Sequence, residues 1–184
     1  MSQSFVVWVL IGLSLLTANL PFVSERPFLL LPWTQSPRTG RPAWLKWLVS
    51  LLFLGLLGLA AYLAFVLIGQ AFFVASDPAS LGWFMGKLAL AMAVVAALLA
   101  APGWLNRGHP VQKSFLTRLL EALAFYGLVG TLGLAFEANM GNMFRQTWEF
   151  YAVTLSLFLV LAYPGFVYRY LLRHRKRRAA PPAD

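Results

Sequence analysis

The longest uncharged apolar segment of the chain is WLVSLLFLGLLGLAAYLAFVLIGQAFFV, residues 47–74, which contains no Asp, Glu, Lys or Arg. An α-helix rises about 1.5 Å per residue, so about 20 apolar residues cross the roughly 30 Å of hydrocarbon in a bilayer. This segment is longer than that and carries no charge. It is therefore predicted to be a transmembrane helix that tilts or frays at one end.

The composition of the whole chain agrees with this prediction. Of 184 residues, 60% are hydrophobic and only 11% are charged. Such a chain has too few polar side chains to cover a globule of this size. The absence of cysteine excludes disulfides, thiol nucleophiles and cysteine-ligated metal sites. The sequence thus indicates an all-α, polytopic membrane protein.

Four further segments have the length and hydropathy of a membrane span. The uncharged part of one of them, residues 122–136, is only about 22 Å long, so Arg118 and Glu121 must lie in or near the membrane for it to cross. The last span contains Pro164 and Gly165, where a kink is expected. We expect one transmembrane domain over residues 1–172, with about five spans near residues 4–23, 47–74, 88–106, 116–136 and 150–168, and a basic cytoplasmic tail at residues 173–184.

The distribution of basic residues predicts the orientation. All but Lys87 and Arg145 of the 15 Lys and Arg residues fall in the first connection, the third connection with the start of the fourth span, or the tail. Because loops rich in Lys and Arg stay in the cytoplasm, the N-terminus is predicted outside and the C-terminus inside. The other two connections, around residues 74–82 and 137–149, are expected to be turns.

Three charges near the second of these turns are candidate functional or pairing residues. Glu137 and Glu149 could face each other across the turn, with Arg145 between them, and relay protons or bind a cation. The simpler interpretation is that Asn139 and Gly141 help to make the turn, that Arg145 pairs with one glutamate, and that the acids mark the membrane interface. We favour the simpler interpretation because functional acids usually lie deeper.

Glu121 is the better functional candidate because it lies inside the predicted fourth span. An ionised carboxylate is costly there unless it is paired or hydrated. Arg118 lies one helical turn earlier and is the expected partner. A pair that only positions the helix is the favoured interpretation, and a proton or quinone role is the alternative.

Small residues punctuate two of the predicted spans. Small residues allow transmembrane helices to approach closely, so these faces are expected to pack against helices of this chain or of another. The residues are Gly55 and Gly58 in the second span and Gly127, Gly130 and Gly133 in the fourth.

Other kinds of site have no support in the sequence. The two histidines, His109 and His174, lie in basic connecting segments and cannot form a bis-histidine haem site in the membrane or a zinc triad. No phosphate-binding glycine loop or nucleophile elbow occurs. Attraction to anionic lipid at the cytoplasmic face explains the basic tail without nucleic acid. We expect no enzymatic activity, no metal and no cofactor.

Four motifs carry a resemblance to an uncharacterised family of small proteobacterial inner-membrane proteins, whose genes tend to lie beside those of the respiratory NADH:quinone oxidoreductase, complex I. The resemblance covers about half of the chain, and many members lack most of the region that corresponds to residues 41–109. The motifs are Ala18-Asn19-Leu20-Pro21-Phe22 with Glu25-Arg26, Arg118-Leu119-Leu120-Glu121, Trp148-Glu149-Phe150-Tyr151-Ala152 and Tyr163-Pro164-Gly165-Phe166.

The resemblance implies a multi-pass protein of the bacterial inner membrane that works with other membrane subunits. We expect a non-catalytic accessory or assembly subunit associated with complex I. The competing hypothesis is a small transporter or proton-conducting protein that uses Glu121, Glu137 and Glu149. Gene neighbourhood alone gives no mechanism for either.

Overall fold

The computed structural model describes residues 3–35, 42–71, 78–106, 113–141 and 145–172, which confirm an all-α fold. The predicted basic tail and both histidines lie outside these residues. The helices are α1 (Gln3–Val23), α2 (Ala43–Gly69), α3 (Pro78–Leu105), α4 (Phe115–Asn139), α5 (Trp148–Leu161) and α6 (Tyr163–Val167), followed by the π-helical turn η2 (Tyr168–Leu172).

Helices α1 to α4 are each long and apolar enough to cross a membrane, and α5 forms a fifth candidate span together with α6 and η2. The prediction of about five spans is confirmed. The fifth is bent by 40° between Leu161 and Tyr163. The cause lies in the sequence, because Pro164 has no backbone N–H to continue the helical hydrogen bonds. The kink predicted at Pro164 and Gly165 is therefore present.

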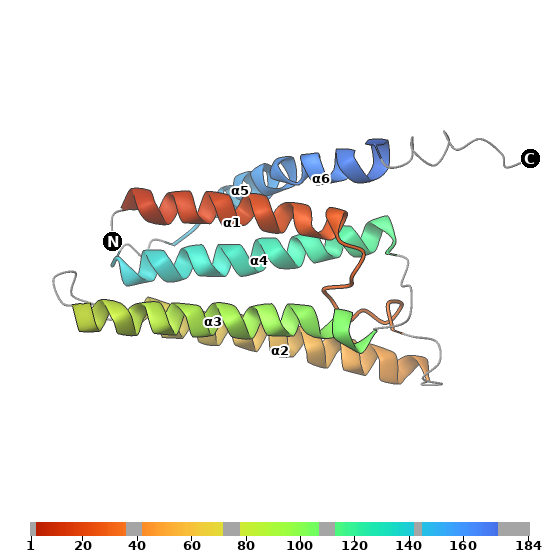
Figure 1. Cartoon of the computed structure of the whole chain (residues 1–184), viewed down its shortest axis with the longest axis horizontal. Coiled ribbons are helices and arrows are strands. Elements are labelled where there is room, and N and C mark those ends of the chain that lie inside the picture. Colours follow the sequence, from red (N-terminus) through yellow and green to blue (C-terminus); the bar gives the residue numbers. More distant parts are fainter. Residues whose placement is uncertain (1–2, 36–41, 72–77, 107–112, 142–144, 173–184) are drawn as a thin grey trace, which may run out of the picture.

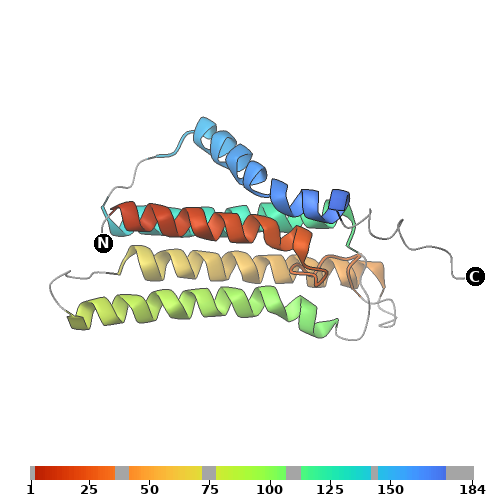
Figure 2. The same cartoon turned by 45° about the horizontal axis from the view of Figure 1, so that its top comes forward.

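Helix α4 is the centre of the bundle (Figures 1 and 2). It packs against α1 on one side and against α2 on the other, and α3 packs on the bundle through α2. Helix α6 packs against α1, whereas α5 splays away from α1 and α4 toward its own N-terminus, as Figure 2 shows. The bend before α6 thus opens a wedge between α5 and the rest of the bundle.

The helices alternate in direction, so five helix termini meet at one end of the bundle (Figure 1). These are the C-termini of α1 and α3, the N-termini of α2 and α4, and η2. We call this the basic end, because Arg26, Lys46, Lys113 and Arg169 lie there. Among the described residues the predicted segregation is present, since only Lys87 and Arg145 lie toward the opposite end. The side of the membrane that the basic end faces stays a prediction.

The tryptophans mark both ends of the bundle, as expected for residues that prefer the membrane interface. All seven are at least half exposed. Trp8, Trp83 and Trp148 lie toward the opposite end, and Trp33, Trp44, Trp47 and Trp104 toward the basic end.

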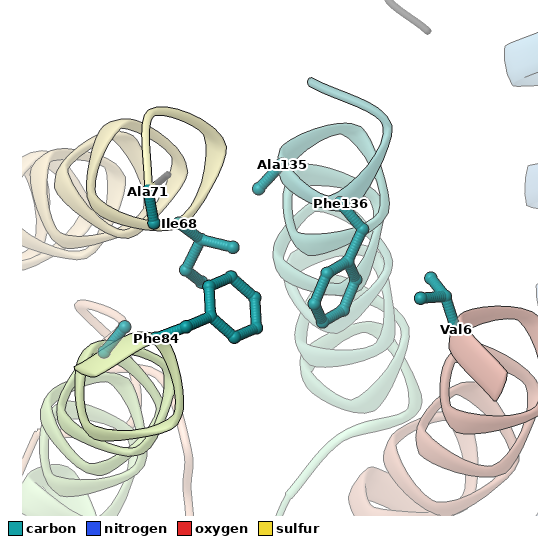
Figure 3. Close-up of a cluster of buried hydrophobic side chains, with 7 residues drawn as sticks. Val6, Ile68, Ala71, Phe84, Ala135 and Phe136 are labelled. Carbon is teal, nitrogen blue, oxygen red and sulfur yellow. The ribbon is translucent and has the colours of Figure 1, made fainter. Parts of the chain in front are cut away.

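Apolar side chains close the bundle at the opposite end (Figure 3). Phe84 of α3 is 1% exposed and packs with Ile68 of α2, Phe136 of α4 and Val6 of α1 in one buried cluster. Asn139 ties two helices here, because its amide nitrogen donates to the carbonyl oxygens of Ile68, at 3.0 Å, and Ala71. Gly141 ends α4 with a φ of +75°, which agrees with its predicted place in a turn.

The bounds of two helices, α2 and α3, differ from the expected spans. Helix α3 begins at Pro78, so residues 78–82, which were expected in a turn, are helical. Proline fits the first turn of a helix because its fixed φ is helical and its missing N–H would have no partner there. Helix α2 begins at Ala43 rather than near residue 47 and ends at Gly69.

Candidate functional site

The connection after α1, residues 24–35, folds inward at the basic end and positions the candidate site. Its side chains Leu29 and Leu31 are buried in a cluster with Leu57 of α2. The Thr34 hydroxyl accepts a hydrogen bond from the N–H of Leu31 at 3.0 Å, which makes a tight turn inside the fold. Buried backbone must find hydrogen-bond partners within the protein, and charged side chains of α4 supply several of them.

Glu121 is fully buried on α4 and has two partners. Its Oε2 lies 2.6 Å from the ammonium group of Lys113, and both side chains are 0% exposed. Its Oε1 accepts a hydrogen bond of 2.7 Å from the backbone N–H of Phe28 in the inward-folded connection. Lys113 also lies over the Phe28 ring, 4.6 Å from its centroid. Burial lowers the pKa of Lys113, and the adjacent carboxylate of Glu121 opposes this shift.

Arg118 is also fully buried, and it closes the end of α1. Its Nη1 donates to the carbonyl oxygens of Pro21 at 2.6 Å, Phe22 at 3.1 Å and Ser24 at 3.3 Å. Those carbonyls have no partner within α1 because the helix ends there. A cation at a helix C-terminus also interacts favourably with the helix dipole. Arg118 therefore caps α1 from a neighbouring helix.

Glu25 joins Arg118 to the end of the chain's last helix. Its carboxylate lies 3.1 Å from Nη2 of Arg118 and forms a second ion pair with Arg169 of η2. Partial burial raises the pKa of Glu25, but the hydrogen bond and charge of Arg169, with those of Arg118, outweigh this effect, so the pKa lies below its ordinary value of 4.5.

Asn19 of α1 bonds to the kink between α5 and α6. Its Nδ2 donates to the carbonyl oxygen of Leu161 at 2.8 Å, and its Oδ1 accepts from the N–H of Gly165 at 2.6 Å. The amide thus pairs with backbone groups on both sides of Pro164. A side chain at position 165 would collide here, because an added Cβ would lie 2.8 Å from Oδ1 of Asn19.

Together these residues form a closed polar cluster, defined as Glu25, Lys113, Arg118, Glu121 and Arg169. Each carboxylate pairs with a cation, and the cluster joins the end of α1, the inward-folded connection, α4 and η2. Only the Lys113–Glu121 pair is buried on both sides, and breaking such a pair by removing one partner costs about 3–5 kcal/mol, whereas the Glu25 side chain is 46% exposed. The geometry of the cluster suits a structural role, in which the cluster holds these four segments together.

The predicted pairing of Arg118 with Glu121 is wrong. Although the two are one turn apart on α4, Arg118 turns to the end of α1 and Glu121 turns to Lys113 and Phe28. The connection between residues 24 and 35 offers both side chains better partners than each other. Sequence reasoning also missed Lys113, Asn19, Glu25 and Arg169 as site residues, although Asn19 and Glu25 lie within the motif that carried the family resemblance.

The three candidate charges at the opposite end do not form a site in the described residues. Glu137 accepts a hydrogen bond of 3.2 Å from Gln146, and Glu149 is exposed in the first turn of α5. The prediction that Arg145 pairs with one of these glutamates is wrong, since the ion pairs found among described residues involve neither it nor them. The splay of α5 separates the two helix ends (Figure 2).

Four of the five predicted packing glycines have no close neighbour within the described chain. Apart from the backbone of the same helix and the two neighbouring residues, no atom of the described chain lies within 4 Å of a Cβ added at Gly55, Gly58, Gly127 or Gly130. Only Gly133 is approached, by the Leu10 side chain at 3.6 Å. The three glycines of α4 line a groove of about 660 Å³ between α1, α4 and α5, together with Glu137 at its end.

Comparison with known proteins identifies a family but no characterised relative. A family model described as a protein of unknown function, DUF2818, matches residues 6–107 and 79–173. No curated protein and no solved structure has a significant match to the chain. The two matched segments together cover all five candidate spans. The chain therefore belongs to the DUF2818 family of proteins of unknown function.

Proposed function

We propose that this protein is a non-catalytic accessory or assembly subunit of the respiratory NADH:quinone oxidoreductase in the bacterial inner membrane. The observation that carries the proposal is the open glycine face of α4. Gly127 and Gly130 line a groove whose walls come from α1 and α5, and a side chain at either position would have free space. A glycine inside a helix makes the helix about 1 kcal/mol less stable than an alanine does. Close packing of a helix from another subunit would explain why glycines occupy these two positions.

The polar cluster supports a structural role over proton transport. The side chains of Lys113 and Glu121 are fully buried and bonded to each other, and Arg118 is held by three carbonyl oxygens and Glu25. A proton carrier needs a carboxylate that alternates between partners or water. These side chains instead hold the end of α1 and the following connection against α4, which keeps the walls of the groove in place.

The choice of complex I as the partner comes from the family resemblance and its gene neighbourhood. A larger membrane complex would cover the groove between α1, α4 and α5 with one of its own helices. The competing function is ion transport by Glu137, which lines the same groove. The two proposals differ in whether the groove binds a subunit or conducts ions.

Gly130→Leu tests the docking proposal. Because an added side chain at position 130 meets open space within the chain, the variant is expected to insert and fold normally. Its bulk would exclude a helix from the groove, with a cost of about 1–3 kcal/mol in a packed interface. Co-migration with complex I on a native gel in mild detergent should fall.

Gly86→Leu is the matched control, since Gly86 of α3 also has open space and does not line the groove. Equal co-migration of both variants with complex I would contradict docking through this groove. Proton flux into vesicles that contain the purified protein, abolished by Glu137→Gln, would favour transport instead.

A further inference from the structure

A second cavity, which shares only Val129 and Thr131 of its wall with the groove between α1, α4 and α5, lies in the middle of the bundle. Its volume is about 200 Å³, and residues of α1, α2, α3 and α4 line it. An engineered apolar cavity of about 150 Å³ stays free of water and binds benzene or xenon. A cavity of this size is therefore large enough for a hydrocarbon ligand, and it costs stability when it is empty.

The wall of the cavity selects for hydrocarbon. Leucine, alanine, valine, isoleucine, phenylalanine and methionine side chains make most of it. The two hydroxyl groups in the wall are already used, because Thr17 donates to the carbonyl oxygen of Leu13 at 2.7 Å and Thr131 to that of Gly127 at 2.7 Å. A polar ligand would lose its bonds to water and gain few in return.

The cavity is open to the surrounding lipid on one side. Helices α2 and α4 pack against each other and form its floor, whereas α1 and α3 do not pack against each other. The buried cluster around Phe84 closes the opposite end (Figure 3). An occupant therefore enters sideways, between α1 and α3.

A cationic side chain lies at the end of α3, one helical turn beyond the cavity wall. Arg26 follows α1, is exposed, and passes over the end of α3, where its Cβ would lie 3.5 Å from a Cβ added at Gly103. The cavity wall on α3 extends from Ala91 to Leu99, and Gly103 is one turn further on. From Gly103 to Ala91 is about 18 Å along the helix, close to the roughly 15 Å that the chains of one leaflet occupy.

We infer that the cavity holds one acyl chain of an anionic phospholipid from the leaflet at the basic end, with the lipid phosphate bound by Arg26. The apolar wall favours a hydrocarbon chain, and the gap between α1 and α3 gives that chain a route from the bilayer. The guanidinium group of Arg26 favours a headgroup with a negative charge. The bound lipid fills the space between α1 and α3 that no side chain of the described residues fills.

Photo-crosslinking of the full chain tests this inference. The probe is phosphatidylglycerol with a diazirine in the middle of one acyl chain, mixed into phosphatidylcholine vesicles that contain the protein. Labelled peptides are mapped by mass spectrometry. Phe125 and Ile68 line the cavity, do not line the groove between α1, α4 and α5, and are only 4% and 1% exposed, so bulk lipid does not reach them readily. Label on these residues is the expected result.

Two pairs of variants separate the chain site from the headgroup site. Ala64→Phe fills the cavity from its floor and should reduce label on Phe125 and Ile68 at least fivefold, whereas Ala93→Phe on the exposed face of α3 should not. Arg26→Gln should reduce labelling by phosphatidylglycerol about fivefold, which corresponds to about 1 kcal/mol, and Lys87→Gln at the opposite end should not.

Several results would overturn the inference. Label confined to outward-facing residues of the wild-type protein would show that no chain enters, and this result does not depend on any variant folding. Unchanged label in Ala64→Phe would show that the chain lies elsewhere. Ala61→Phe fills the same floor and replaces Ala64→Phe if that variant does not fold. Equal labelling by phosphatidylglycerol and phosphatidylcholine probes would remove the role of Arg26.

Discussion

Removal of Glu121 is expected to be among the most costly single changes in the bundle. In Glu121→Leu, the ammonium group of Lys113 stays buried beside Phe28 without its carboxylate, and the Phe28 N–H loses its acceptor. Breaking a buried pair in this way costs about 3–5 kcal/mol, whereas replacing both partners by apolar residues is often neutral. The double variant Lys113→Met with Glu121→Leu should therefore recover the part of the loss that comes from the unpaired ammonium group, while the loss of the acceptor for the Phe28 N–H, about 1–3 kcal/mol, remains.

The free energy of unfolding can be compared by titrating SDS into protein held in mild detergent micelles. Glu137→Leu on the same helix is the matched control, because within the described residues its carboxylate accepts a hydrogen bond from Gln146 alone, and the loss of that bond should cost about 1 kcal/mol or less. Two results would contradict the pairing of Lys113 with Glu121: a Glu121→Leu variant within about 0.5 kcal/mol of the wild type, or a double variant that loses the sum of both single changes.

Three further predictions concern the cluster, the kink and the orientation. The pKa of Glu25 is lowered in the folded protein, so the ion pairs of Glu25 stabilise the fold above its ordinary pKa of 4.5, and this stabilisation is lost as pH falls through the lower pKa of the folded state. The difference in unfolding midpoint between the wild type and Glu25→Gln should therefore shrink as pH falls over that range. A difference that grows would contradict the lowered pKa. Gly165→Ala should destabilise the folded protein by about 1–3 kcal/mol, because the new Cβ would lie 2.8 Å from the Asn19 amide oxygen. Gly12→Ala is the control and should not change the stability, since a Cβ at Gly12 has no close neighbour in the described chain. Equal melting temperatures of the two variants would contradict the close contact at Gly165. Single cysteines at positions 38 and 142 test the orientation, because only position 142 should react with an impermeant thiol reagent from outside the cell, and the reverse pattern would overturn the N-out topology.

The helices could be predicted from sequence because membrane thickness sets their length and charges mark their ends. Residues 47–74 lack charge, and most of this segment lies in α2. The kink at Pro164 follows from the missing backbone N–H. The start of α3 is harder to predict, because Pro78, Gly82 and Gly86 are typical of turns and yet lie within the helix.

The packing faces and the polar cluster could not be predicted in the same way. Helices that are apolar all round show no periodic pattern that says which side meets a neighbour. The contact of Glu121 with Phe28 joins residues 93 positions apart, and it exists only because residues 24–35 fold inward. Local spacing instead favoured Arg118 as the partner of Glu121, which the observed geometry contradicts.

The most direct test of the account is site-specific crosslinking from the glycine face of α4 in living cells. A photoreactive amino acid replaces Gly130 in the protein at native expression, and crosslinked products are identified by mass spectrometry. The same amino acid at Gly86 of α3, outside the groove, is the control. The account predicts crosslinks from position 130, and not from position 86, to a membrane subunit of complex I. An abundant, correctly inserted protein that crosslinks from position 130 only to lipid would contradict it.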